Sequence, residues 1–261
     1  MYSEKGLIFF PTRELEGMPE DYQLPYENVF FPAADGTKLH GWFVPAARTE
    51  VRATLLWFHG NAGNISHRLK NLALLHRHLE FSIFIFDYRE FGLSAGRISK
   101  AGTYEDARGA WTYLVGERRL DPRDILLFGR SLGTALAVLI ASIEPCLGVV
   151  LEAAFTSSHD MLSRYFPWGI PASLLQSSYN NMSKIGSIQA PILLIHAEHD
   201  EAIPADMANR LYERVQAPKW FYRVPGAGHN DTYVVDEPSY FQQWRIFLKE
   251  CLRRRDEGAG G

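Results

Sequence analysis

The stretch Ile125-Leu126-Leu127-Phe128-Gly129-Arg130-Ser131-Leu132-Gly133 decides the fold of this chain. Four apolar residues run into a Gly-Arg-Ser-Leu-Gly turn, and a second apolar run, Leu132 to Ile140, follows directly. This order is typical of a buried strand, a sharp turn and a buried helix. The turn crowds the backbone around Ser131, and glycines 129 and 133 fit there because they carry no Cβ. We therefore expect the Ser131 hydroxyl to stand at the tip of a sheet, within reach of a substrate and a base.

Composition favours one large domain. The chain has 261 residues, of which 46% are hydrophobic and 13% aromatic, so it can bury a sizeable core. Its formal net charge is -3, from 27 basic and 30 acidic residues, which gives no electrostatic reason to expect a nucleic acid partner. Cys146 and Cys251 lie far apart in dissimilar contexts, so they predict neither a disulfide framework nor a metal site. This cysteine usage favours a reducing compartment.

No signal peptide or membrane span is visible in the sequence. The apolar run Leu7-Ile8-Phe9-Phe10 is followed by Pro11 and is far shorter than the about 20 residues of a transmembrane helix. We expect this run to pack on the domain. The alternative is a surface anchor, although no basic cluster accompanies it. We therefore expect a cytoplasmic protein with no integral membrane segment, and the sequence does not indicate an oligomeric state.

Apolar runs alternate with helical patterns, which predicts an α/β fold with a mostly parallel eight-stranded sheet and helices on both faces. The predicted strands are Tyr26–Phe31, Leu39–Val44, Thr54–Phe58, Ser82–Phe86, Ile125–Phe128, Val149–Leu151, Ile192–Ile195 and Trp220–Val224. An Asp-Gly turn separates the first two strands, so they should form an antiparallel hairpin at one edge. The predicted helices are Ile65–Leu79 with Asn64 as N-cap, Thr103–Val115, Leu132–Ser142, Ala205–Val215 and Tyr240–Leu252.

One segment, residues 155–188, breaks this alternation and predicts a small cap inserted in a single domain of residues 1–252. It would lie above the carboxyl ends of the strands, where ligands bind in open α/β sheets. Its rings Phe155, Phe166 and Trp168 are candidates for lining an apolar acyl pocket. The alternative is that these aromatic rings bury the insertion against the body of the domain. Residues 253–261 are charged and then Gly-rich, so we expect a disordered tail.

A serine hydroxyl is a poor nucleophile at neutral pH, so Ser131 needs a base that is oriented by a carboxylate. Asp200 lies in the loop after one predicted strand, and His229 lies on the Gly-rich loop after the last strand. Glu152 is the rival for the acid because it also ends a buried strand. His199 could be the base only if Asp200 were not the acid. The predicted catalytic residues are therefore Ser131, Asp200 and His229.

Backbone N–H groups must also stabilise the negative charge that develops on an attacked carbonyl oxygen. The small-residue loop His59-Gly60-Asn61-Ala62-Gly63-Asn64 follows a predicted strand and can expose such groups. We assign the oxyanion donors to the N–H of Leu132 and the N–H of Asn61, with Ala62 as the alternative to Asn61. The alternative is that this loop is only a strand-to-helix turn. Its occurrence together with the Ser131 turn and the Asp200 and His229 loops disfavours that alternative.

With these parts together, the chain resembles the α/β-hydrolase superfamily, and most of all its single-domain serine esterases and lipases with a small cap, including Bem-type and thioesterase-like hydrolases. The resemblance covers nearly all of Tyr26 to Leu252. It rests on His59–Asn64, Asp87-Tyr88-Arg89, Gly129–Gly133, Asp200 with Ile203-Pro204, and Gly228-His229. Family members commonly have Asp-Tyr-Arg-Gly in the loop after the fourth strand, whereas this chain has glutamate, Glu90, in place of that glycine.

The resemblance and the residues together indicate a serine esterase that cleaves carboxylic acyl esters through an acyl-enzyme, with no metal and no organic cofactor. The expected partner is a small acyl ester. A long-chain acyl thioesterase or a lipase is the alternative within the hydrolases. A non-catalytic binding module on the same fold is the alternative of another class, because fold does not determine function.

Overall fold

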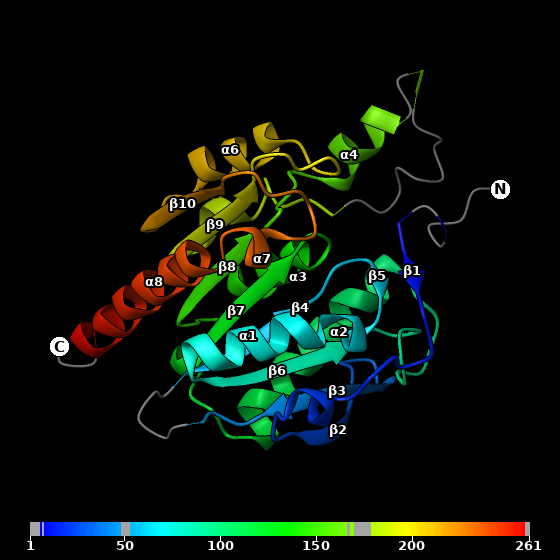
Figure 1. Ribbon diagram of the computed structural model, residues 1–261. Helices are drawn as coiled ribbons and strands as arrows, with labels where there is room; N and C mark the ends of the chain where they lie inside the picture. Colours follow the sequence, from blue (N-terminus) through cyan, green and yellow to red (C-terminus); the bar gives the residue numbers. More distant parts are fainter. Residues whose placement is uncertain (1–5, 7, 48–52, 166–167, 170–178, 259–261) are drawn as a thin grey trace.

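The computed structural model describes residues 6, 8–47, 53–165, 168–169 and 179–258. Its centre is an eight-stranded sheet with the order β10-β9-β8-β7-β4-β6-β3-β2 (Figure 1). The strands are β2 (Glu27–Pro32), β3 (Lys38–Val44), β4 (Thr54–Phe58), β6 (Ser82–Asp87), β7 (Ile125–Arg130), β8 (Gly148–Glu152), β9 (Ile192–Ala197) and β10 (Lys219–Val224). Strands β2 and β3 are antiparallel to their neighbours, and the other six are parallel. The predicted sheet and its edge hairpin are therefore confirmed.

Helices cover both faces of the sheet (Figure 1). One face packs against α1 (Leu69–Leu79) and α8 (Glu237–Gly258). The other face packs against α2 (Lys100–Thr112), α3 (Gly133–Ala141) and α6 (Ala205–Arg214). Successive residues of the central strands alternate between these two cores, so β7 and β8 are buried on both faces. Every residue of α3 is also buried, which follows from its apolar sequence.

The region after β4 begins as the sequence predicts. Asn64 is the N-cap of the 3-10 turn Ile65–Arg68, and its Oδ1 accepts a hydrogen bond from the N–H of Ser66 at 2.9 Å. This turn leads into α1. The cap therefore fixes where the loop that follows β4 ends and the helix begins.

An N-terminal strap, defined here as residues 8–13, runs along the loop that follows β4. Its strand β1 (Phe10–Pro11) pairs in parallel with β5 (Ala62–Gly63) (Figure 1). Phe9 is only 1% exposed and belongs to the core between the sheet and α2 and α3. Residues 8–10 of the apolar run thus lie along the domain, as expected, and Leu7 lies outside the described residues.

The prediction of a disordered tail is wrong up to Gly258, because α8 continues to that residue. Side chains explain the extra turns. Glu250 pairs with Arg253 one turn further along, and Arg255 reaches Asp124 in the turn before β7. Residues 259–261 lie outside the described part of the chain.

The described parts of the insertion include α4 (Ser158–Tyr165) and a bridge between Ser157 and Asn180. The short helix α7 (Thr232–Val235) precedes α8. Within the residues described, we find no helix with the length and apolar character needed to cross a membrane.

Candidate active site

Ser131 lies in a strained turn between β7 and α3. Its φ is +52°, in the left-handed region that a residue with a Cβ rarely adopts. A Cβ on Gly129 would lie 2.5 Å from the carbonyl oxygen of Gly133, and one on Gly133 would lie 2.0 Å from that of Phe58. Both glycines are therefore required by close backbone approaches. The N–H of Ser131 donates to the carbonyl of Glu152 at 2.9 Å, which anchors the turn to β8.

Asp200 and His229 come together from loops that lie 29 residues apart in the chain. The Nδ1 atom of His229 lies 2.9 Å from both carboxylate oxygens of Asp200. Oδ1 of Asp200 also accepts from the N–H groups of Ala202 and Ile203. Burial alone would raise the pKa of Asp200, but these hydrogen bonds outweigh it and lower that pKa below its ordinary value. The carboxylate is thus charged at neutral pH, and it favours the proton on Nδ1, which leaves Nε2 as the acceptor.

The alternatives weighed from sequence lie elsewhere. The carboxylate of Glu152 is wholly buried and accepts from Arg130, Thr232 and Tyr240, so its oxygens are occupied away from the His229 ring. The His199 side chain is 71% exposed and lies beside Glu198 rather than Asp200. Of the two acidic candidates, Asp200 is therefore the one bonded to a histidine on the Gly-rich loop.

The loop His59–Asn64 presents backbone donors beside Ser131. The carbonyl of Asn61 accepts from the N–H of Phe10 at 2.9 Å, and the Asn61 side chain donates to the carbonyl of Ile8 at 2.7 Å. Among the described residues, no acceptor is bonded to the N–H of Asn61 or of Leu132. The Leu132 N–H also stands at the N-terminus of α3, where the helix dipole favours negative charge. These two donors are thus available for an anion.

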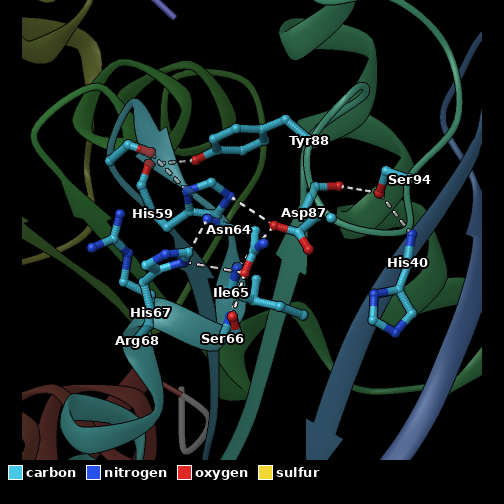
Figure 2. Close-up of polar contacts among 12 residues, drawn as sticks. His40, His59, Asn64, Ile65, Ser66, His67, Arg68, Asp87, Tyr88 and Ser94 are labelled. Carbon is cyan, nitrogen blue, oxygen red and sulfur yellow. Dashed lines mark hydrogen bonds and ion pairs between the residues drawn. The ribbon is translucent and has the colours of Figure 1, made fainter. Parts of the chain in front are cut away.

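A buried polar cluster contacts this loop (Figure 2). The His59 ring stacks on Tyr88 with ring centres 4.2 Å apart, and Tyr88 Oη donates to the carbonyl of His59 at 2.8 Å. His59 Nδ1 lies 2.7 Å from the carbonyl of Gly60, and its Nε2 lies 3.6 Å from Asp87. Asp87 in turn accepts from the N–H of Ile65 at 2.9 Å. The cluster ties the start of the loop to its end through side chains of the next strand.

The cluster is a support and not a second catalytic pair. His59 is wholly buried, and burial together with the charge of Arg68 lowers its pKa to about 3. Burial also raises the pKa of Asp87 well above its ordinary value. Burial therefore disfavours the charged form of both groups, and neither lines the cavity of Ser131.

Glu90, which replaces the glycine usual in the family, keeps a glycine-like backbone. Its φ is +70°, so the loop retains the left-handed conformation that glycine adopts at little cost. The Glu90 carboxylate accepts from the N–H of Ile98 at 2.8 Å. The Glu90 side chain thus adds a hydrogen bond within the loop.

A cavity of about 530 Å³ unites these groups. Its wall includes Ser131, His229, Asn61 and Leu132. No hydrogen bond joins the side chains of Ser131 and His229 in the part of the chain described. Much of the remaining wall is apolar, with Ile8, Phe10, Phe155, Met161, Leu162 and Ile203.

The three predicted substrate-binding residues have different outcomes. Phe155 lines the cavity and is 5% exposed. Trp168 is 98% exposed and is not part of the wall, so it does not line the pocket as predicted. The composition of the insertion could not distinguish an outward ring from an inward one. Phe166 lies outside the described residues.

The sequence reasoning missed the N-terminal strap as part of the wall. Ile8 and Phe10, near the N-terminus, line the cavity. No local sequence pattern predicts that contact. It also missed Met161 and Leu162 of α4, although an apolar face on a helix of the insertion is a signal that could have identified them.

The arrangement combines a strained serine, a carboxylate-oriented histidine and two unoccupied N–H donors on one apolar cavity. This set can support nucleophilic attack on a carbonyl and stabilise the resulting oxyanion. Across the described residues, no group of three or more His, Cys, Asp and Glu side chains is arranged to hold a metal ion.

Comparisons with known proteins agree with this architecture. The sequence profile of the prolyl oligopeptidase family matches residues 89–255. Protein bem46 of Schizosaccharomyces pombe is 31% identical over 259 residues, covering 95% of this chain and 86% of that protein. The alpha/beta hydrolase domain-containing protein WAV2 of Arabidopsis thaliana is 30% identical over 283 residues, covering 98% and 91%.

Solved structures extend the likeness to the fold. The esterase Pf2001 of Pyrococcus furiosus superposes with a TM-score of 0.74 over 93% of this chain and 98% of that one. The sequence identity in this comparison is 20%, so the likeness concerns the fold alone.

Proposed function

Because this chain belongs to the α/β-hydrolase superfamily, as a relative of the Bem46-type proteins, we propose that it is a serine hydrolase that cleaves carboxylic acyl esters. The observation that carries the proposal is the 2.9 Å contact between His229 Nδ1 and Asp200, with His229 and the strained Ser131 on one cavity wall. The fold alone would also suit a binding protein. The strain at Ser131 favours catalysis, because such strain persists mainly where function requires it.

In the proposed reaction, His229 Nε2 takes the proton from Ser131 Oγ as that oxygen bonds to the acyl carbon. The carbonyl electrons move to its oxygen, and the N–H groups of Leu132 and Asn61 stabilise the oxyanion. The oxyanion collapses, the ester C–O bond breaks, and His229 gives its proton to the departing alkoxide. Water then attacks the acyl-enzyme with His229 again as base, which releases the acid and restores Ser131. Asp200 stabilises the imidazolium in both halves of the reaction.

The cavity wall supports an uncharged, apolar acyl group. Its described residues include no Asp or Glu, so the wall offers no carboxylate as a partner for a charged amine on the substrate. This argues against a substrate whose free amino terminus binds in the cavity, despite the name of the matching peptidase family. A volume of about 530 Å³ suits a small to medium ligand.

The test is hydrolysis of p-nitrophenyl esters of two to sixteen acyl carbons by the wild type and by Ser131→Ala. Ser142→Ala, at the other end of α3, is the matched control, because its hydroxyl donates only to the carbonyl of Leu139. We expect Ser131→Ala to lose activity and Ser142→Ala to retain it. Labelling by a fluorophosphonate probe, located by mass spectrometry, should fall on Ser131.

The outcomes separate the alternatives. A rate that rises to the longest chains, or that is higher on acyl thioesters, would replace the esterase with a lipase or a thioesterase. Hydrolysis of aminoacyl p-nitroanilides in preference to esters would assign a peptidase. A folded wild type that neither hydrolyses these substrates nor reacts with the probe would refute a catalytic role for Ser131 and leave a binding module.

A further inference from the structure

Arg130 occupies the position that the Gly-x-Ser-x-Gly pattern leaves variable, yet its side chain is built into the site. The residue is 5% exposed. Its Nε donates to Glu152 Oε1 at 2.9 Å, and its Nη2 donates to the main-chain carbonyl of His229 at 2.6 Å. The same Nη2 lies 3.3 Å from Asn230 Oδ1. One guanidinium therefore joins the end of β7, directly before Ser131, to the loop that carries His229.

Glu152 completes this link from the neighbouring strand. It is the last residue of β8, lies opposite Arg130 in the strand register and is wholly buried. Besides Arg130, its carboxylate accepts from Thr232 Oγ1 at 2.7 Å and from Tyr240 Oη at 2.6 Å. Its main-chain carbonyl accepts the N–H of Ser131. Both carboxylate oxygens thus have partners, as a buried charge requires.

The proposed base is consequently held at three separate points. Asp200 holds the ring of His229, Glu201 accepts its N–H at 3.1 Å, and Arg130 donates to its carbonyl. We propose that Arg130 and Glu152 are positioning residues that fix the main chain of His229 relative to Ser131. This inference rests on the proposed function, because it takes His229 as the base that serves Ser131. Neither side chain touches the reacting atoms, so their effect must pass through His229.

The pair also places a cation and an anion beside the loop that carries the imidazole. The charged and titratable groups that surround His229 are Asp200, Glu201, Asp231, His196 and the Arg130–Glu152 pair. A cation near an imidazole disfavours its protonated form, and an anion favours it. Neutralising Arg130 alone should therefore raise the pKa of His229, and neutralising Glu152 alone should lower it. A residue that contributed only to folding would produce no such opposite shifts.

The first measurement is the titration of His229 by NMR, using protein labelled at histidine Cε1 and a His229→Gln variant to assign the signal. We expect Arg130→Gln to raise the His229 pKa and Glu152→Gln to lower it, each by roughly half a unit or more. The double variant should return close to the wild type. This readout does not need catalysis, so it tests the pair even if the wild type hydrolyses no ester and the proposed function fails.

The second measurement is ester hydrolysis by Arg130→Lys, which keeps the charge and loses the forked geometry. We expect kcat to fall by about tenfold or more while KM stays within about twofold, because a small displacement of a catalytic group has a large effect on rate. Arg89→Lys is the matched control, because Arg89 makes a similarly buried pair with Asp106, at 2.8 Å, without contacting His229.

Two results would overturn the proposal. One is a His229 pKa that stays unchanged, or moves in the same direction, in Arg130→Gln and Glu152→Gln. The other is an Arg130→Lys enzyme whose kcat falls no more than that of Arg89→Lys. Circular dichroism and urea unfolding of each variant show which of them are folded, and the titration is compared among those.

Discussion

Replacing Gly133 with alanine should push helix α3 and the Ser131 turn away from strand β4. An ideal Cβ at position 133 lies 2.0 Å from the carbonyl oxygen of Phe58 and 2.8 Å from that of His59. Real Cβ contacts essentially never fall below 3.0 Å. Both neighbours are backbone atoms at the end of a central strand, so they cannot rotate aside. The helix must therefore shift by roughly 1 Å to relieve the overlap.

This displacement has two consequences, one for stability and one for activity. Overpacking of a well-packed core costs about 1–3 kcal/mol, so the free energy of unfolding should fall by that amount. The Ser131 hydroxyl and the Leu132 N–H move with the turn, and a misplacement of about 1 Å can reduce a catalysed rate by about 100-fold. A 100-fold loss of rate corresponds to about 2.7 kcal/mol, so we expect the activation free energy and the free energy of unfolding to change by similar amounts.

The assays are urea unfolding followed by tryptophan fluorescence and the rate of fluorophosphonate labelling at Ser131. Gly116→Ala is the matched control, because a Cβ there meets nothing within 4 Å and the residue has no positive φ. That substitution should leave labelling unchanged and raise stability by about 0.4–1 kcal/mol. A Gly133→Ala protein that is as stable and as quickly labelled as Gly116→Ala would refute the reasoning.

Three further predictions concern other parts of the molecule. Asp200→Asn should lower kcat by about 10³–10⁴-fold, because the amide no longer stabilises the imidazolium of His229. Asp206→Asn, at an exposed position, is the control. Equal kcat in the two variants would contradict the assignment of Asp200 as the acid. Ile8→Trp should shorten the preferred acyl chain in the p-nitrophenyl ester series and Ile8→Ala should lengthen it, because Ile8 lines the cavity; an unchanged optimum in both would remove the strap from the acyl wall. Burial lowers the pKa of His40 from 6.5 to about 4, so its neutral form stabilises the fold above pH 6.5 and this contribution is lost as the pH falls. Relative to His40→Gln, the wild type should lose about 1.4 kcal/mol of unfolding free energy per pH unit between pH 6.5 and pH 4, measured by urea unfolding; parallel pH profiles would show that His40 titrates normally.

The fold was largely predictable because its signals are local. The central strands are short apolar runs, and residues within a few positions of one another set that pattern. The glycines at 129 and 133 likewise mark a crowded turn from their own neighbourhood. Local rules failed at the C-terminus, where polar composition indicated disorder. There, pairs such as Arg253 with Glu250 and the contact of Arg255 with Asp124 accompany a continued helix.

In the candidate site, too, the features with local sequence signals were predictable and the others were not. Ser131, Asp200 and His229 could be selected because each follows a strand and the carboxyl ends of parallel strands meet at one edge of the sheet. The direction of an individual side chain has no such marker, and Trp168 therefore differed from its expected place in the pocket.

The sequence by itself determined which segments form strands, where the crowded serine turn lies and which groups can react. These features depend on residue type and short spacing. Only the tertiary structure decided that the N-terminal strap walls the cavity and that Arg130 bridges Glu152 to His229, a residue 99 positions away. Such contacts arise when distant segments are buried together, because each buried polar group must then find a partner wherever the fold provides one.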